Sequence, residues 1–329
     1  MHPFEFIESQ TAEGAIHAVV ADPQAVFFAG GTTLVDLMKL DVMTPGALVD
    51  INRALPDSIE ERAGKIQIGA NVRNSDVAYH RLIRERFPVL SEAILAGASA
   101  QLRNMASTGG NILQRTRCPY FREAHAACNK RAPGSGCDAM KGYHRSHAVL
   151  GTSESCIATH ASDMCVALAM LDAVVFTQKE NGKGRRIPFN DFHLLPGETP
   201  ERETVLERGE LILRVEIEPS KLSRQSHYLK VRDRASYEFA LASAAVALDL
   251  EEGTIRAARV ALGGVATKPW RSPEAEAALT GKPAAKETFR AAAEAAFSGA
   301  KPRRDNAFKI ELGKRTLVRA LEELWRQHS

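Results

Sequence analysis

The chain has 329 residues, 44% hydrophobic and 25% charged, so it can bury two or three cores and we expect a multi-domain soluble protein. Its net charge of +3 comes from 43 basic and 40 acidic residues spread along the whole length, which argues against nucleic acid or a membrane surface as a partner. No apolar run approaches the roughly 20 residues that span a bilayer, and the first six residues do not resemble an export signal.

The first 70 residues alternate strand and helix signals. An apolar run at 25–28 predicts a strand that ends in a glycine turn at 29–34, and Leu34, Leu37 and Met38 then recur at helical spacing. Further strands are expected at 48–51 and 66–70. The order strand, glycine turn, helix is therefore the first structural unit of the chain.

The middle of the chain mixes helices with loops. We expect a helix capped near residues 74–76 and an alanine-rich helix at 92–100. After a cysteine-rich stretch, Ser162 is expected to cap an apolar helix, a strand follows at 173–176, and a loop rich in glycine and proline covers 182–200.

The last third changes character. Residues 211–217 alternate apolar and charged side chains, which predicts a half-buried strand, and a polar cluster at 218–225 suggests a domain boundary. The segments that follow are expected to be a strand and then further elements: a helix at 239–250, a strand at 258–262, and helices at 275–279, 291–297 and 317–325.

Two glycine turns point to an anionic ligand. Glycines such as Gly30 and Gly31 let the backbone approach a ligand closely, while Thr32 and Thr33 supply hydroxyls, so a diphosphate would suit the turn. An isolated Gly-Gly is more often an ordinary tight turn, but a second such turn occurs at 108–111. Neither matches the dinucleotide fingerprint G-x-G-x-x-G or the nucleotide motif ending in Gly-Lys-Ser/Thr, which disfavours nicotinamide and ATP.

All five cysteines fall between positions 118 and 165. An odd number in one stretch of a large protein argues against a disulfide framework and favours metal or cluster ligation. Four thiolates suit an iron–sulfur cubane, and zinc would accept them equally well. Cys165 is expected to be a core thiol, and four nearby histidines are expected to be surface or supporting residues: His125, His144, His147 and His160.

Several segments together resemble one known family. They are the turn at 29–32, the segment 103–111, the Ser162-Asp163 pair and the run at 261–269. Their order and spacing resemble the FAD-binding medium subunit of the xanthine dehydrogenase family of molybdenum hydroxylases. Residues 113–156 look like an insertion that carries four cysteines, which is similar to the flavoprotein subunit of the periplasmic aldehyde oxidoreductases with their extra [4Fe-4S] cluster.

The resemblance implies an α+β fold: a vanillyl-alcohol-oxidase-like (PCMH-type) FAD-binding domain of two α/β subdomains, followed by a small α+β domain. The expected divisions are 1–55, 56–221 with the insertion at about 113–156, and 222–329.

The resemblance also implies the residues that hold the two cofactors. The expected FAD contacts are Ala29, Gly30, Gly31, Thr32, Thr33, Leu34, Arg103, Thr108, Gly109, Gly110, Asn111, Ser162, Asp163 and Lys230. The expected cluster ligands are Cys118, Cys128, Cys137 and Cys156. For Lys230, a solvated lysine on a strand is an equally good interpretation, Arg232 and Arg234 are expected to be surface charges, and Gly263 and Gly264 fit a structural turn.

By the same resemblance the chain passes electrons and has no catalytic residues of its own. Substrate oxidation would occur at molybdenum on a large subunit, a small subunit would carry [2Fe-2S] centres, and this chain would deliver electrons through FAD to a small external acceptor in a heterotrimer that oxidises aldehydes. Export to the periplasm with a partner subunit is expected, with the cytoplasm as the alternative. Two other readings stay open: a stand-alone FAD oxidase and a zinc-organised scaffold without activity.

Overall fold

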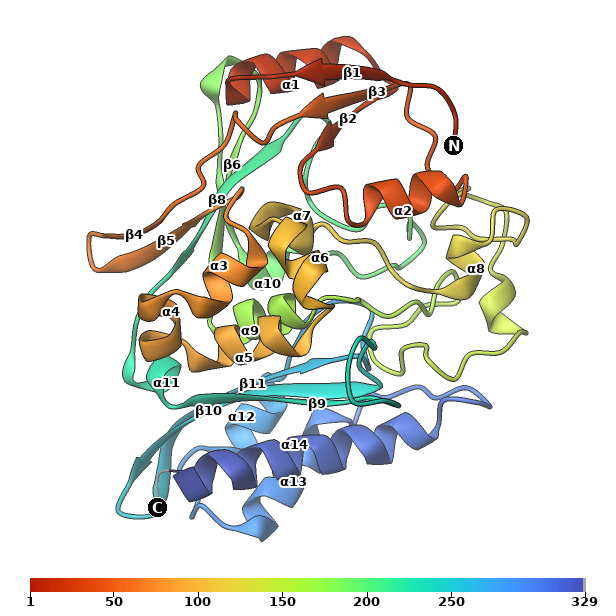
Figure 1. The fold of residues 1–329 in the computed structure, drawn as a ribbon. Helices are drawn as coiled ribbons and strands as arrows, with labels where there is room; N and C mark the ends of the chain where they lie inside the picture. Colours follow the sequence, from red (N-terminus) through yellow and green to blue (C-terminus); the bar gives the residue numbers. More distant parts are fainter. Residues whose placement is uncertain (328–329) are drawn as a thin grey trace.

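The computed structural model describes residues 1–327, which form three β-sheets with helices packed between and around them (Figure 1). The first sheet is parallel, with strand order β1-β3-β2, and lies at the N-terminal end. Its strands and helices are β1 (Glu5–Glu8), α1 (Ala12–Ala21), β2 (Ala25–Phe28), α2 (Leu34–Lys39) and β3 (Ala47–Asp50).

The second sheet is antiparallel, with strand order β4-β5-β8-β6-β7. Its strands are β4 (Ile59–Arg62), β5 (Lys65–Gly69), β6 (Val174–Gln178), β7 (Arg186–Pro188) and β8 (Leu211–Ile217). A group of short helices lies between this sheet and the third: α3 (Asn74–Tyr79), α4 (Arg81–Arg86), α5 (Pro88–Ala96), α6 (Ala100–Met105), α7 (Thr108–Ile112), α9 (Asp163–Met170) and α10 (Phe189–Phe192). One hydrophobic core runs through both sheets and these helices, with the exception of α6.

The third sheet is antiparallel, with strand order β12-β11-β10-β9, and helices pack on both of its faces. Helices α5 and α9 contact one face, and α12 and α14 contact the other (Figure 1). The elements are α11 (Lys221–Arg224), β9 (Ser226–Val231), β10 (Ala242–Glu251), β11 (Thr254–Gly263), β12 (Trp270–Arg271), α12 (Pro273–Leu279), α13 (Lys286–Ala296) and α14 (Phe308–Gln327). Among residues 1–327, no helix has both the length and the apolar character needed to cross a membrane.

Most predicted elements of the first two sheets are present, but the helix predicted at 239–250 is wrong. That segment is strand β10, buried at each position from Ala242 to Leu248 because helices cover both faces of its sheet. A continuous apolar run of this kind lacks the period-2 alternation that marks a half-buried strand, so periodicity alone does not separate it from a buried helix. The loop predicted at 182–200 likewise contains β7 and α10.

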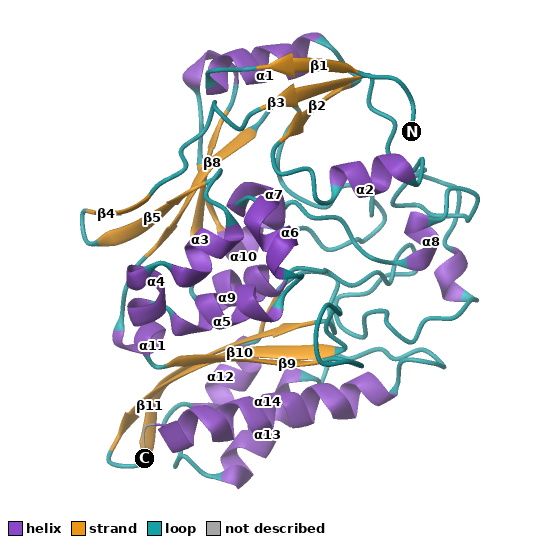
Figure 2. Ribbon diagram, viewed as in Figure 1, coloured by secondary structure: helices purple, strands orange, loops and turns teal. Residues whose placement is uncertain are grey.

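The cysteine-rich insertion has almost no regular structure. Between α7 and α9 the chain forms only α8 (Pro119–Arg122) and a single 3₁₀ turn, η1 (Asp138–Met140), and Figure 2 shows the rest as loop. It packs around a small apolar cluster of its own that includes Phe121 and Leu37 of α2. The insertion therefore lies against the helix that follows the first glycine turn.

Candidate functional site

The first glycine turn is shaped by close backbone contacts. A Cβ on Gly30 would lie 1.9 Å from the carbonyl oxygen of Met105, so no other residue fits there without moving the backbone of α6. Gly31 has φ +69°, and a Cβ there would meet the Phe28 ring at 2.7 Å. The two glycines thus bring the end of β2 directly against the segment that leads into α7.

This turn leaves hydrogen-bond donors free. In the described part of the chain, the backbone N–H groups of Gly30, Gly31, Thr32 and Thr33 donate to no protein acceptor. Buried or half-buried N–H groups in native proteins find partners almost without exception. A row of four such groups suits the oxygens of a diphosphate.

The turn lines two adjoining cavities of about 220 Å³ and 510 Å³. Thr32, Thr33 and Gly110 line both, so the cavities form one cleft. We call it the flavin cleft, after the cofactor that the resemblance predicts for it. Of the residues expected at FAD, the cleft is lined by Ala29, Gly30, Gly31, Thr32, Thr33, Leu34, Arg103, Gly109, Gly110, Asn111, Asp163 and Lys230.

The second glycine turn is built differently, because its polar groups are already paired. Thr108 is buried and donates both its N–H and its hydroxyl to the carbonyl of Val72. Ser162 donates to Asn111 Oδ1 at 2.6 Å while its hydroxyl accepts from the Cys165 N–H, which caps α9. Thr108 and Ser162 therefore do not line the cleft, and Ser162 holds the Asn111 side chain in position from behind its wall.

A buried ion pair forms the far wall of the flavin cleft. Lys230 Nζ lies 2.8 Å from Asp163 Oδ2, and the two side chains are 3% and 9% exposed. The Tyr228 hydroxyl donates to the other carboxylate oxygen at 2.6 Å, and burial followed by the Asp163 charge raises the pKa of Tyr228 well above its usual value. Lys230 is thus not a solvated lysine, and it also donates to the Ala96 carbonyl.

Sequence reasoning missed two groups that line the cleft. Arg117 and Arg122 come from the insertion and both bond Asp36 of α2, at 2.8 and 2.6 Å. Hydrogen bonding from Arg122, aided by both arginine charges, lowers the pKa of Asp36 against the opposing effect of burial. The β9–β10 loop adds Tyr237 and Phe239. Both arginines lie within four positions of Cys118 in the sequence. That closeness to a predicted ligand was the only sequence signal that could have pointed to them.

The four cysteines of the insertion act as one electrostatic group, which we call the thiol cluster: Cys118, Cys128, Cys137 and Cys156. All four are free thiols. Burial raises the pKa of Cys118 to about 12, and the neighbouring Cys156 and Cys128 add to the shift. Burial also raises the pKa of Cys137 and of Cys156, with Cys128 contributing to both.

The spacing of the thiol cluster limits what it can hold. Within residues 1–327, three ligand atoms of His, Cys, Asp or Glu come within 4.8 Å of one another only at His160, Cys165 and His193, so no three sulfurs of the thiol cluster are that close. Two sulfurs on one tetrahedral zinc ion would be about 3.8 Å apart, given a Zn–S distance of about 2.3 Å. A preformed single-ion site is therefore absent from the cluster.

Side chains rather than secondary structure hold the insertion in shape. Arg131 donates to the carbonyls of Tyr120, Phe121, Ala124 and Ala126. The buried Lys309 of α14 donates to two carbonyls of the insertion, Ser146 and His147. It also donates to the carbonyl of Gly264, directly after β11, and so ties the insertion to the third sheet.

The four histidines of this region differ in role. His147 Nε2 lies 3.1 Å from Cys118 Sγ, which makes it a supporting contact of the thiol cluster. His144 is buried and faces Asp305 at 3.1 Å, while His125 is exposed. His160 lies apart from them, against His193.

Comparison with known proteins gives a consistent answer. Residues 2–220 match the family described as FAD binding domain in molybdopterin dehydrogenase, and residues 227–324 match the CO dehydrogenase flavoprotein C-terminal domain. The aldehyde oxidoreductase FAD-binding subunit PaoB of Escherichia coli (strain K12) is 50% identical, over 98% of each chain. The glyceraldehyde dehydrogenase medium chain of Sulfolobus acidocaldarius is 26% identical, over 86% of this chain and 83% of that one.

A solved structure of carbon monoxide dehydrogenase from Hydrogenophaga pseudoflava contains a chain similar in fold, with a TM-score of 0.77, 26% identity, and 99% and 98% of the two chains covered. The predicted fold, a FAD-binding domain followed by a small α+β domain, is thereby confirmed.

Proposed function

The chain belongs to the family of FAD-binding subunits of molybdopterin dehydrogenases, and from that premise we propose that it is the FAD- and [4Fe-4S]-carrying electron-transfer subunit of a molybdenum-dependent aldehyde oxidoreductase. Family membership makes it an oxidoreductase subunit with a FAD-binding domain. The cluster, the substrate class, the partners and the location are the proposal.

One observation carries the proposal: the insertion that bears the thiol cluster also builds the wall of the flavin cleft. Arg117 and Arg122 line the cleft and flank Cys118 in the sequence. Leu37, on the helix that follows the first glycine turn, packs in the same small apolar cluster as Cys118 and Cys128. Two redox groups bound at these places would lie next to each other.

The residues of the cleft suit FAD. The free N–H groups of the first turn would receive the diphosphate, and the cationic side of the cleft, with Lys230 and Arg103, would face the rest of the cofactor. FAD accepts electrons one at a time and releases one or two, and the protein supplies position and electrostatics. The buried Lys230–Asp163 pair, which is neutral as a whole, places the Lys230 ammonium at one end of the cleft.

The thiol cluster favours iron–sulfur over zinc. Among the described residues no three of these four free thiols form a group close enough for a single ion, and four thiolates are the ligand set of a [4Fe-4S] cluster. Burial raises the pKa of Cys118 and of Cys156, so ligation has to remove their protons and is coupled to ordering of the loop. We propose that this cluster supports the loop or forms a side branch of the electron path.

Substrate class, partners and location follow from the relatives. Two of them are named for aldehyde oxidation, which supports an aldehyde as substrate of the whole complex. We propose a heterotrimer with a molybdenum-cofactor subunit and a [2Fe-2S] subunit, and delivery of electrons to a small acceptor. We also propose that the folded complex works in the periplasm, carried there by a signal on a partner; cell fractionation with a cytoplasmic marker tests this.

The Cys128→Ser variant tests the central claim. In the purified complex, the variant should lose the iron of this subunit and the broad iron–sulfur absorption, while flavin absorption is retained. His125→Gln is the matched control, because it changes an exposed side chain of the insertion between Cys118 and Cys128 and should leave iron unchanged. Full iron with normal acceptor reduction in Cys128→Ser would count against ligation by Cys128.

A further inference from the structure

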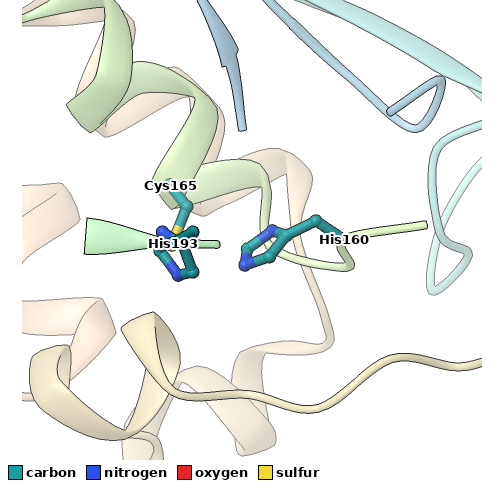
Figure 3. A group of neighbouring side chains, drawn as sticks. All are labelled: His160, Cys165 and His193. Atoms are coloured by element: carbon teal, nitrogen blue, oxygen red, sulfur yellow. The ribbon is translucent and has the colours of Figure 1, made fainter. Parts of the chain in front are cut away.

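A second group of potential ligands lies outside the thiol cluster. His160, Cys165 and His193 come from three separate segments: the exit of the insertion, the first turn of α9, and the residue after α10. Figure 3 shows the Cys165 sulfur beside the His193 ring, with the His160 ring facing both. One ligand atom from each lies within 4.8 Å of the other two.

Two ring nitrogens at this place lack partners. His193 Nε2 donates to the Ile112 carbonyl at 3.1 Å, which leaves Nδ1 with a free lone pair, and Nδ1 is buried without a hydrogen-bond partner. His160 Nε2 is also buried and unpartnered. A backbone carbonyl that holds the far nitrogen of an imidazole is the usual support of a metal-ligating histidine, and unpaired buried polar atoms are rare in native proteins.

We propose that His160, Cys165 and His193 form a buried site for one soft, thiophilic metal ion, and that Cu(I) fits it better than Zn(II). One thiolate with two imidazoles is a donor set that both ions accept. The site requires only small movements, since two ligands on one ion are closer together than the 4.8 Å that separates these atoms at most.

The charge of the site favours the monovalent ion. A thiolate with Cu(I) is neutral, whereas a thiolate with Zn(II) keeps a buried positive charge. Cationic side chains already lie at the site: Lys268 donates to the carbonyl of His193 at 3.3 Å, and Lys130 lines the cavity beside His160 and His193. Glu203 pairs with Lys130 at 2.9 Å. A further buried positive charge next to Lys268 is costly.

The free site is electrically neutral. Burial raises the pKa of Cys165 to about 12 and lowers that of His193 to about 4, so near pH 7 the thiol is protonated and the imidazole is not. Binding breaks the S–H bond, forms the metal–sulfur bond and releases one proton to solvent. If His160 ligates through Nε2, its ring proton moves to Nδ1 and the long 3.3 Å contact with the Ser162 N–H is lost.

An ion has a route to the site. His160 and His193 line a cavity of about 230 Å³ that also reaches Cys156 and Glu203. On the opposite side the Phe189 and Phe192 rings pack edge-on against His193, at 5.4 and 5.0 Å between ring centres. An ion bound to both His160 and Cys165 would link the segment that follows the insertion to α9, the helix that carries Asp163 of the flavin cleft.

The test is an anaerobic titration of the flavin- and iron-loaded complex with Cu(I) held by bicinchoninate. Cys165→Ala and His193→Gln should each bind one equivalent fewer than the unaltered complex, and the lost equivalent should carry the release of one proton. Val166→Ala, a truncation of a buried neighbour on the same helix, is the matched control and should bind the full number.

Two results would overturn the inference. Equal stoichiometry in all four proteins would remove the site, and displacement of Cu(I) from the Cys165-dependent site by equimolar Zn(II) would overturn the choice of ion. Iron and flavin are measured in the same samples. Missing iron or flavin would count against the proposed function, whereas an unchanged Cu(I) stoichiometry with full iron and flavin would count only against the Cu(I) site. The His193→Gln arm keeps the test valid if Cys165→Ala does not fold.

Discussion

The flavin cleft and the insertion lie side by side but are held in shape by different means. Strands and helices with a continuous core form the cleft, and its free N–H groups are fixed by backbone contacts such as Gly30 against Met105. The insertion has one short helix and depends on individual side chains such as Arg131 and Lys309. The first site is formed before its ligand arrives, whereas the proposed [4Fe-4S] cluster would complete the second.

The largest expected effect is at the turn itself. In Gly30→Ala the new Cβ would overlap the Met105 carbonyl, which cannot move away as a flexible side chain would. We expect loss of flavin and a fall of about 3 kcal/mol or more in the free energy of unfolding. Flavin absorbance per chain and urea unfolding measure both.

Gly299→Ala is the control for that change, because a Cβ at Gly299 meets no atom within 4 Å. It should alter stability by no more than about 0.5 kcal/mol. Normal flavin content in Gly30→Ala would show that the cleft is not preformed by this contact.

The buried ion pair gives the next largest effect. Lys230→Met leaves Asp163 as a buried charge with only the Tyr228 hydroxyl as a side-chain partner. Removing one member of such a pair costs about 3 kcal/mol. We expect reduced stability and weaker flavin binding, measured by unfolding and by flavin titration of the stripped protein.

A double variant separates charge from shape at this pair. Lys230→Met combined with Asp163→Asn removes both charges, and it should recover much of the lost stability, since the interaction energy of contacting residues is not additive. If the double variant is as unstable as the sum of the two single changes, the pair is not the source of the effect.

A substitution in the insertion should affect iron and local structure rather than flavin and global stability. Arg131→Met removes four donated hydrogen bonds, each to a carbonyl in the segment 120–126. We expect loss of more than half of the iron of the proposed cluster, new protease cleavage within 113–156, and a global stability change of only about 2 kcal/mol or less. Flavin content should stay constant, because no flavin-cleft residue bonds Arg131.

Arg81→Met is the matched control, since Arg81 is largely exposed and forms a pair only within α4. Removal of iron from the unaltered complex by a chelator should reproduce the cleavage pattern of Arg131→Met. Loss of flavin together with iron in Arg131→Met would mean that the two regions do not differ as described.

Elements that depend on neighbouring residues alone could be predicted from the sequence. Residues 25–39 follow strand, turn and helix because apolar spacing and glycine placement are local signals, and Ser162 caps α9 for the same reason. Strand β10 could not be predicted, since its burial on both faces depends on helices α5, α9 and α14, which come from distant parts of the chain.

The same limit applies to the candidate site. Sequence patterns identified the glycines and cysteines as candidate site residues. The contacts of Asp36 with Arg117 and Arg122 could not be predicted in this way, because they join residues more than 80 positions apart. His193 carried no sequence signal at all, because it meets Cys165 only through the packing of α10 on α9. The cysteine assignments and the domain divisions stay predictions.

The smallest expected effect lies in the part of the molecule that secondary structure already holds. His227 of β9 faces two carboxylates, Glu92 of α5 at 2.9 Å and Glu323 of α14 at 3.1 Å. Burial alone would lower the pKa of His227, but hydrogen bonds and charge from Glu92 and then Glu323 outweigh it, so the pKa is raised. In its protonated form the imidazole therefore links helices on the two faces of the third sheet.

A raised pKa in the folded state fixes the sign of the pH dependence. The folded protein binds the proton more tightly, so the stabilisation is fully present below the unfolded pKa of about 6.5 and is lost as pH rises through the higher folded value.

We expect His227→Gln to be less stable than the unaltered protein at pH 6 by no more than about 1 kcal/mol, since both carboxylates are partly exposed. By pH 8.5 the difference should shrink. Urea unfolding at both pH values measures this, with the exposed His17→Gln as control; a difference that grows with pH would contradict the assignment. Because α5 and α14 also pack on the sheet without His227, the loss stays small, whereas a comparable loss in the insertion should release the proposed cluster.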